Sequence, residues 1–435
     1  MPSPPLMNVE NGKRTDSIAG SRLRGPFMER HRHRNSSTEV RVVVYSHDTM
    51  GVGHMRRNLL IAAALRKRFA NVNILAIAGA REACGFSQQA GIDCLTLPAF
   101  HKMADGRYTS RSLEIASHDV LEVRSKTILA AVQSFCPQLM IVDKVPAGAG
   151  GELLPALEWL TRSGNGQCVL GLREILDQPE IVQREWAASD MFSVIREYYT
   201  DVWVYGDPVV YDTRVEYRFP RDIGQKTVFT GYLDPSLRLE HFSIEGDSNE
   251  SPPILCTVGG GQDGQLLLRV FAEAMRDSNR RCILLCGPHA TVTTRLELKR
   301  SIGDHDHFEV IDFAPEGDLL IRQASHVVAM GGYNTICAIL SFRKPALIVP
   351  RTQPRKEQLI RASRLAKLGW IDMIHPDELD SQSIRTWIDS SQGRPHPGPN
   401  RQPIDLNGLD RIAERFQALL PLAQPGIRSG VPHVH

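Results

Sequence analysis

Two glycines and two histidines separate an apolar run from a helical pattern within residues 42–69. Gly51, Gly53 and His54 lie at this junction, and His47 stands directly after the apolar run. Histidine titrates near neutral pH, so His54 could accept a proton from a hydroxyl group as a general base. The alternative is a structural or helix-capping histidine, which is the role we expect for His47.

Two further strand ends carry ionisable side chains. Asp143 ends the apolar run LMIVD, and Arg173 and Glu174 follow VLGL. Because the carboxyl ends of parallel strands meet at one edge of a sheet, these groups should lie near His54. Asp143 could be the base itself, could orient His54, or could be an ordinary loop cap.

A second glycine junction, GGGQDG, joins the strand pattern ILCTV to the helical pattern QLLLRVFAEAM. Glycine allows close backbone approach, and a helix N-terminus offers free N–H groups with partial positive charge. Together they favour a phosphate site formed by Gly259, Gly260, Gly261 and Gln262, with a tight turn that binds nothing as the alternative.

Familiar nucleotide cofactors fit this junction poorly. G-x-G-x-x-G is present, but no acidic residue ends the next strand, CILLCG, to hold a ribose. No Gly-Lys-Ser/Thr follows either glycine loop, so the P-loop pattern is missing as well. We therefore expect no nicotinamide, flavin or other cofactor.

A third junction, HVVAMGGYNTICAIL, passes from a strand through Gly331 and Gly332 into a helix that we expect Asn334 or Thr335 to cap. Farther along the chain, Glu357 and Gln358 begin another predicted helix. At the carboxyl edge of one parallel sheet these groups can converge with the GGGQDG loop on a single ligand. Amides and hydroxyls suit a diphosphate, and a carboxylate suits ribose hydroxyls.

Strand and helix patterns alternate along two stretches of the 435-residue chain, which predicts two doubly wound, Rossmann-like α/β domains facing across a cleft. We place the first domain at residues 39–231 and the second at residues 252–388. Residues 1–38 are rich in Pro, Ser and Arg and predict a disordered tail. Residues 389–435 predict a loose tail with a short helix that can pack onto the body.

Composition narrows the class of partner and compartment. The formal net charge is only +2, and basic residues are dispersed without interleaved aromatics, which disfavours nucleic acid. Eight single cysteines, no apolar run long enough to span a membrane and no signal-peptide core indicate a cytoplasmic protein. GDHDHFE at 303–309 predicts a solvated loop, and we expect no metal site.

These junctions, together with GGYNTICAILSFRKPALIVPRTQPRKEQ, resemble a GT-B glycosyltransferase of the family 28 type, which includes the N-acetylglucosaminyltransferase of peptidoglycan synthesis. The resemblance covers roughly residues 40–380. It implies inverting, metal-independent transfer from a nucleotide diphosphate sugar, with UDP-N-acetylglucosamine as an example. It also implies that the first domain binds the acceptor and the second binds the donor, with Phe313 beside the nucleobase of the donor. Gly51, Gly53 and Arg173 would face the acceptor.

One position departs from the family pattern, because Ala338 stands where the family often has a ribose-binding Glu. Ribose binding would then fall to Glu357, or activity would be reduced. Two alternatives therefore stay open: a non-hydrolysing sugar-nucleotide 2-epimerase and a degenerate, non-catalytic nucleotide-sugar-binding protein. The acceptor is unknown. A lipid-linked acceptor would place the protein peripherally on the inner face of the membrane.

Overall fold

The computed structural model describes residues 39–47, 53–80, 91–102, 108–164, 166–240, 251–261, 263–303, 305–391 and 401–420. The predicted N-terminal tail, Gly51 and Gln262 lie outside these residues. Within them, no helix combines the length and apolar character that a membrane span requires.

A seven-stranded parallel sheet occupies the first half of the chain, in the order β3-β2-β1-β6-β7-β8-β9. Its strands are β1 (Val40–Ser46), β2 (Val72–Ala78), β3 (Asp93–Thr96), β6 (Leu139–Asp143), β7 (Gln167–Arg173), β8 (Asp201–Tyr205) and β9 (Thr227–Phe229). All five residues of β6 and all five of β8 are buried, which is why these strands read as continuous apolar runs in the sequence.

Helices connect the strands of the first sheet. They are α1 (Gly53–Arg68), α3 (Ser117–Phe135), α4 (Leu154–Ser163), α5 (Pro179–Ala188), α6 (Met191–Tyr198), α7 (Thr213–Glu216) and α8 (Arg221–Gln225). Short elements complete this half: the antiparallel pair β4 (Phe100–Lys102) and β5 (Tyr108–Ser110), and the 3₁₀ turns η1 (Ala149–Gly151) and η2 (Pro235–Leu239).

A six-stranded parallel sheet follows, in the order β12-β11-β10-β13-β14-β15. Its strands are β10 (Ile254–Thr257), β11 (Cys282–Leu285), β12 (Phe308–Ile311), β13 (His326–Ala329), β14 (Ala346–Ile348) and β15 (Asp372–Met373). The accompanying helices are α9 (Gln265–Met275), α10 (Val292–Ile302), α11 (Gly317–Gln323), α12 (Tyr333–Ser341), α13 (Glu357–Lys367), α14 (Ser381–Ser391) and the 3₁₀ turn η3 (Pro376–Glu378).

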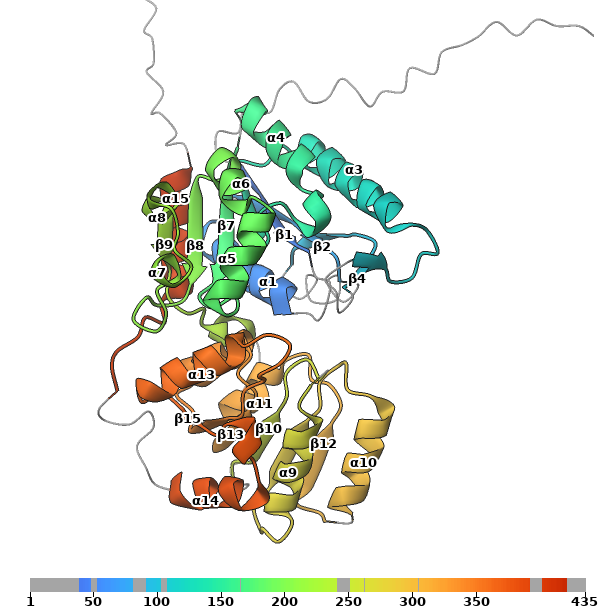
Figure 1. The fold of residues 1–435 in the computed structure, drawn as a ribbon, viewed down its shortest axis with the longest axis vertical. Helices are drawn as coiled ribbons and strands as arrows, with labels where there is room; N and C mark the ends of the chain where they lie inside the picture. Colours follow the sequence, from blue (N-terminus) through green and yellow to red (C-terminus); the bar gives the residue numbers. More distant parts are fainter. Residues whose placement is uncertain are drawn as a thin grey trace, which may run out of the picture. The chain divides into compact units, whose positions relative to one another are not determined.

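The predicted fold class is confirmed, because each half contains one parallel sheet with its own helices (Figure 1). In the first sheet the strand order reverses between β1 and β6, and in the second between β10 and β13. Such switch points open a crevice at the carboxyl ends of the strands, where ligands bind in doubly wound folds. The predicted domain boundary at residues 231–252 includes residues outside the described ones and stays a prediction.

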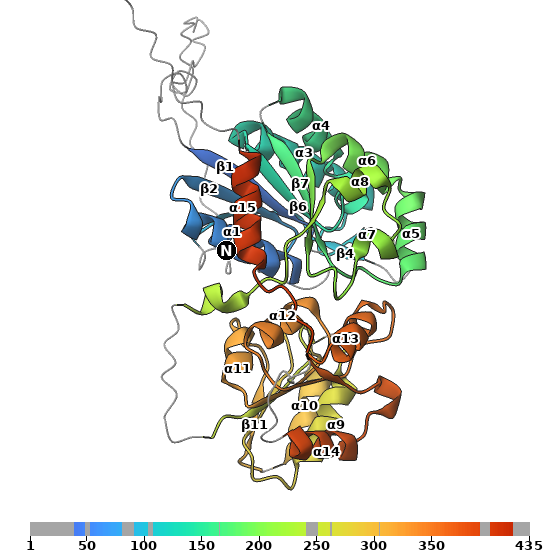
Figure 2. The same ribbon diagram turned by 90° about the vertical axis from the view of Figure 1, so that its left-hand side faces the viewer.

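The last helix, α15 (Gly408–Leu419), packs against α1 of the first half, as Figure 2 shows. The Phe69 and Phe416 ring centroids lie 5.1 Å apart, and Ile412 and Phe416 are fully buried. The short helix expected within residues 389–435 is therefore present, and it packs onto the body of the protein. The apolar face of α15 stabilises its return to the body, since burying such side chains contributes about 1.5–3 kcal/mol each.

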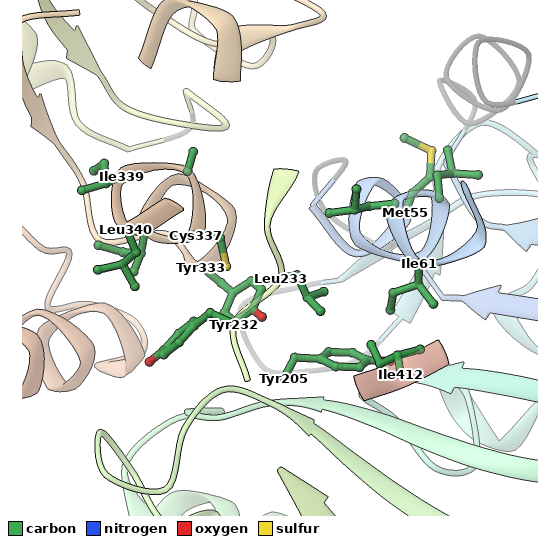
Figure 3. Packing of buried hydrophobic residues seen from close by; sticks show 14 of the residues in the cluster. Met55, Ile61, Tyr205, Tyr232, Leu233, Tyr333, Cys337, Ile339, Leu340 and Ile412 are labelled. Carbon is green, nitrogen blue, oxygen red and sulfur yellow. The ribbon is translucent and has the colours of Figure 1, made fainter. Parts of the chain in front are cut away.

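An apolar cluster joins elements of the two halves (Figure 3). Tyr232 and Leu233 follow β9 and lie between α12, which contributes Tyr333 and Cys337, and α1, which contributes Met55. The Tyr232 and Tyr333 rings are stacked with their centroids 6.2 Å apart. This packing brings the N-termini of α1 and α12, two of the predicted site junctions, next to each other.

Candidate functional site

A cavity of about 320 Å³ lies where the carboxyl edges of the two sheets meet. It contains most of the residues that the sequence singled out. From the first half these are Gly53, His54 and Arg173; from the second they are Gly259, Gly260, Phe313, Gly332, Asn334, Thr335, Glu357 and Gln358. Gly261, Gly331 and Asp143 lie behind this lining.

His54 is the second residue of α1, so it belongs to a helix rather than to the glycine loop that we expected. Its Nδ1 is hydrogen-bonded to Asp143 Oδ2. A carboxylate can only accept, so Nδ1 carries the proton and Nε2 is left as an acceptor. Burial lowers the pKa of His54 to about 4, although Asp143 opposes the shift. The imidazole is therefore neutral near pH 7.

Asp143 is fully buried behind His54 and is held by Arg57, a residue that sequence reasoning missed. Arg57 Nε donates to Asp143 Oδ1 at 3.1 Å. Burial alone would raise the pKa of Asp143, but the charge of Arg57 and the hydrogen bonds from His54 and Arg57 outweigh it and hold the pKa well below its usual range. An ionised carboxylate in this position can fix the tautomer and orientation of His54.

A signal for Arg57 was present in the sequence. It stands three residues after His54, and residues at that spacing share one face of a helix. Its guanidinium also lies over two tyrosine rings, 5.8 Å from the centroid of Tyr205 and 5.4 Å from that of Tyr333. Nothing in the sequence pointed to these aromatic neighbours, because they come from distant elements.

The GGGQDG junction presents its backbone to the cavity. Gly259, Gly261 and Gly264 adopt φ of 66°, 80° and 91°, which side chains rarely tolerate. A Cβ on Gly261 would lie 2.4 Å from the carbonyl oxygen of Cys286, so this position has no room for one. Gly264 is the N-cap of α9, whose first N–H groups are therefore available near the cavity.

The third junction differs from expectation at its cap. Gly332, not Asn334 or Thr335, is the N-cap of α12, and no side chain caps this helix. The backbone of Gly332 is extended (φ −63°, ψ 142°), and the helix begins at the next residue, Tyr333. Asn334 Nδ2 instead donates to the carbonyl oxygen of Gly53 at 3.1 Å, which ties this junction to the one that carries His54.

Glu357 and Gln358 stand in the first turn of α13, as predicted, and both bond to Arg351. Arg351 Nη2 lies 2.5 Å from Glu357 Oε1, and its backbone N–H donates to Gln358 Oε1 at 3.2 Å. Glu357 Oε2 is buried, and no residue that the structure describes forms a hydrogen bond with it. Burial raises the pKa of Glu357, but Arg173 and Arg351 lower it further, so the carboxylate is ionised.

Glu174 does not line the cavity and instead forms a fully buried ion pair with Arg361, at 2.6 Å from its Nε. Arg361 Nη1 also donates to the carbonyl oxygen of Gly331 at 3.1 Å. The pair thus connects the end of β7 to the third glycine junction. Sequence reasoning missed Arg361 because its partner is 187 residues away.

Ala338 is fully buried and lies outside the cavity lining. Sequence reasoning also missed other residues of the cavity wall. Near Phe313, the wall carries Asp318, which accepts from Arg56 Nη2 at 3.5 Å, and His289, whose Nε2 is buried without a hydrogen-bond partner. In the described part of the chain, no three His, Cys, Asp or Glu side chains come together as metal ligands.

Residues 254–403 match the glycosyltransferase family 28 C-terminal domain. A UDP-N-acetylglucosamine–N-acetylmuramyl-(pentapeptide) pyrophosphoryl-undecaprenol N-acetylglucosamine transferase of Clostridium botulinum is 25% identical over 188 residues, 40% of this chain and 51% of that protein. An uncharacterized glycosyltransferase of Methanosarcina acetivorans is 26% identical over 167 residues, 38% of this chain and 42% of the relative. The chain thus spans about half the length of the curated relatives it matches.

Similarity to solved structures extends over most of the chain. A glycosyltransferase of kitacinnamycin has a TM-score of 0.57 at 14% identity, covering 88% of this chain and 99% of that one. MurG of Acinetobacter baumannii has a TM-score of 0.55 at 13% identity, covering 87% and 99%. A putative UDP-N-acetylglucosamine 2-epimerase of Listeria monocytogenes has a TM-score of 0.59 at 11% identity, covering 87% and 95%. At such identities the likeness shows the fold, two Rossmann-like domains in the GT-B arrangement.

Proposed function

We propose that this chain, whose residues 254–403 form a glycosyltransferase family 28 C-terminal domain, transfers a sugar from a nucleotide diphosphate donor to an acceptor hydroxyl. One observation carries the proposal. His54, a neutral base, and the glycine junctions around Gly260 and Gly332 line the same cavity. A base and a diphosphate site facing each other are what this transfer requires.

His54 acts as the general base in this proposal. Its Nε2 takes the proton of the acceptor hydroxyl as the acceptor oxygen attacks the anomeric carbon. The bond from that carbon to the phosphate oxygen breaks, and its electron pair leaves with the diphosphate. The configuration at the anomeric carbon is thereby inverted. Asp143, held by Arg57, stabilises the imidazolium that forms.

Backbone N–H groups stabilise the departing diphosphate. The N-terminus of α12 supplies N–H groups and partial positive charge at the cavity wall, and α9 follows the glycine loop whose Gly259 and Gly260 line the cavity. This arrangement supports transfer without a metal ion, because the charge of the leaving group meets fixed dipoles. Glu357 Oε2 is the acceptor that we assign to a donor hydroxyl, since Ala338 offers none.

The name of one relative supports a class of donor and a class of acceptor. The Clostridium botulinum protein is named for UDP-N-acetylglucosamine and an undecaprenol-linked acceptor, which supports a UDP-linked donor here. For the acceptor we infer a lipid-linked sugar met at the inner face of the membrane.

A two-stage experiment tests the function. Thermal-shift measurements with UDP, GDP and dTDP should show that UDP raises the melting temperature most. UDP release from UDP-sugars is then measured with and without candidate acceptors, for the wild type and for His54→Ala. Acceptor-dependent release that His54→Ala abolishes supports transfer. No stabilisation by any nucleotide would reject the proposal.

A 2-epimerase is the second candidate, because the Listeria monocytogenes protein shares the fold. Epimerisation needs acid and base groups around the sugar ring. The cavity carboxylates Glu357 and Asp318 are each engaged by arginine, which argues against that role. Formation of an epimer from the nucleotide sugar in the absence of any acceptor would nevertheless favour this candidate over transfer.

A further inference from the structure

Among the described residues, Arg173 has no ion-pair partner, whereas the other arginines of the cavity wall are paired. It lines the cavity at the end of β7, and its Nε is buried without a hydrogen-bond partner. Within the described part of the chain, it forms no ion pair. The other arginines of the cavity wall have carboxylate partners: Arg56 with Asp318, Arg57 with Asp143, and Arg351 with Glu357.

Because Arg173 forms no ion pair with a described residue, it leaves an unbalanced positive charge at the end of the cavity that contains His54. Burial lowers the pKa of Arg173 to about 10, and repulsion by Arg57 contributes to the shift. Glu357 attracts Arg173 without forming an ion pair and is itself neutralised by Arg351. A partly buried cation is destabilising unless an anion compensates it, so the surroundings of Arg173, one corner of the cavity, favour a negatively charged ligand group.

The position of Arg173 indicates which part of the substrate would carry that group. On one side is Arg57, whose Nη2 lies 3.0 Å from His54 Nδ1. On the other is α13, where Gln358 packs so closely on Gly331 that a Cβ there would lie 3.1 Å from the Gln358 carbonyl oxygen. The corner therefore lies between the base and a diphosphate-binding junction, where the transferred sugar must sit.

We propose that Arg173 binds a carboxylate on the transferred sugar, so that the donor is a nucleotide-linked uronic acid; this inference rests on the proposed function. A guanidinium binds a carboxylate through two parallel N–H···O hydrogen bonds. The unpartnered Glu357 Oε2 in the same corner accepts from a sugar hydroxyl. Arg173 and Glu357 together recognise a sugar ring that carries both a carboxylate and a hydroxyl group.

The test compares UDP, UDP-glucose and UDP-glucuronate by calorimetric titration. The proteins are the wild type, Arg173→Met, Arg173→Lys and the control Arg162→Met, whose side chain is 78% exposed on α4. The wild type should bind UDP-glucuronate about 10- to 100-fold more tightly than UDP-glucose, as expected for a hydrogen-bonded charge pair. Arg173→Met should remove this preference and leave UDP binding unchanged, with Arg173→Lys in between and Arg162→Met like the wild type.

Other outcomes overturn the inference in distinguishable ways. If Arg173→Met weakens UDP as much as UDP-glucuronate, Arg173 binds the diphosphate. If the wild type binds UDP-glucose as tightly as UDP-glucuronate, no carboxylate site exists on the donor side; an Arg173-dependent KM for an acidic acceptor would then place the anion on the acceptor. In both cases UDP still binds and the proposed function stands. Failure of the wild type to bind any of the three ligands would count against the proposed function itself.

Discussion

The two walls of the cavity are built from different chemistry. The wall from the first sheet uses side chains, because His54, Asp143 and Arg57 form a buried hydrogen-bonded cluster. The wall from the second sheet also contains side chains, but at its glycine junctions it presents backbone, where Gly259, Gly260 and Gly332 line the cavity. In our proposal the first wall moves a proton and the second holds a diphosphate.

This contrast predicts different responses to substitution. A side-chain wall loses its chemistry when one functional group is removed, although the backbone remains in place. A backbone wall cannot lose a functional group, and fails only where a new Cβ has no room. The fully buried pair Glu174–Arg361 connects the walls and should matter to both through stability.

Removing the base should have the largest effect. His54→Ala should lower turnover by about 10²- to 10⁴-fold, the usual contribution of general base catalysis, while donor affinity stays within about twofold. Turnover is measured as acceptor-dependent UDP release and affinity by titration with UDP. The control is His118→Ala, a histidine whose side chain is 81% exposed. Retention of more than about a tenth of the turnover would show that His54 is not the base.

Breaking the Glu174–Arg361 ion pair, which connects the two walls, should have the next largest effect. Glu174→Gln leaves Arg361 buried without a countercharge and should lower the free energy of unfolding by about 3–5 kcal/mol. Urea denaturation measures it. The matched control is Glu158→Gln, which removes the exposed pair with Arg162 and should cost about 0–1 kcal/mol. Equal losses in the two variants would mean that the buried pair does not stabilise the connection.

The sequence was sufficient to predict both sheets and the junctions that line the cavity. Buried parallel strands require continuous apolar runs, and tight strand-to-helix turns require glycine, so both leave local patterns such as ILCTVGGG. Glu357 and Gln358 were found in the same way, because a helix start beside a strand end is a local feature. These predictions needed no knowledge of distant contacts.

Pairing between distant residues left no such pattern. Arg361 bonds to Glu174, and Asn334 bonds to Gly53 across 281 positions, so neither partner could be chosen from spacing. The sequence predicted that the C-terminal helix can pack onto the body, but its amphipathic pattern does not reveal that α1 is the surface it covers. Arg57 is intermediate, because its spacing from His54 was visible but its bond to Asp143 was not.

The backbone wall should respond to a single methyl group where the turn is tight. Gly261→Ala places a side chain at φ 80° and a Cβ 2.4 Å from the Cys286 carbonyl oxygen. It should cost at least about 1–2 kcal/mol of stability from the left-handed conformation alone. Gly260→Ala is the control, because its Cβ would meet no atom closer than 3.9 Å. Thermal denaturation of both variants checks the difference, and similar melting temperatures would contradict the backbone account.

The smallest change expected is in the neutral fraction of His54 between pH 7.5 and 5.5, and it tests the side-chain wall directly. Because the pKa of His54 is about 4, the neutral imidazole should persist as pH falls from 7.5 to 5.5, whereas an ordinary histidine with a pKa of about 6.5 would lose about tenfold of its neutral form. The folded state rejects a proton that the unfolded state binds, so stability should rise with pH between about 4 and 6.5. NMR titration of the His54 ring checks this without an acceptor. A midpoint between pH 6 and 7 would show that burial does not keep His54 neutral, and the side-chain wall would then be a pH-sensitive element.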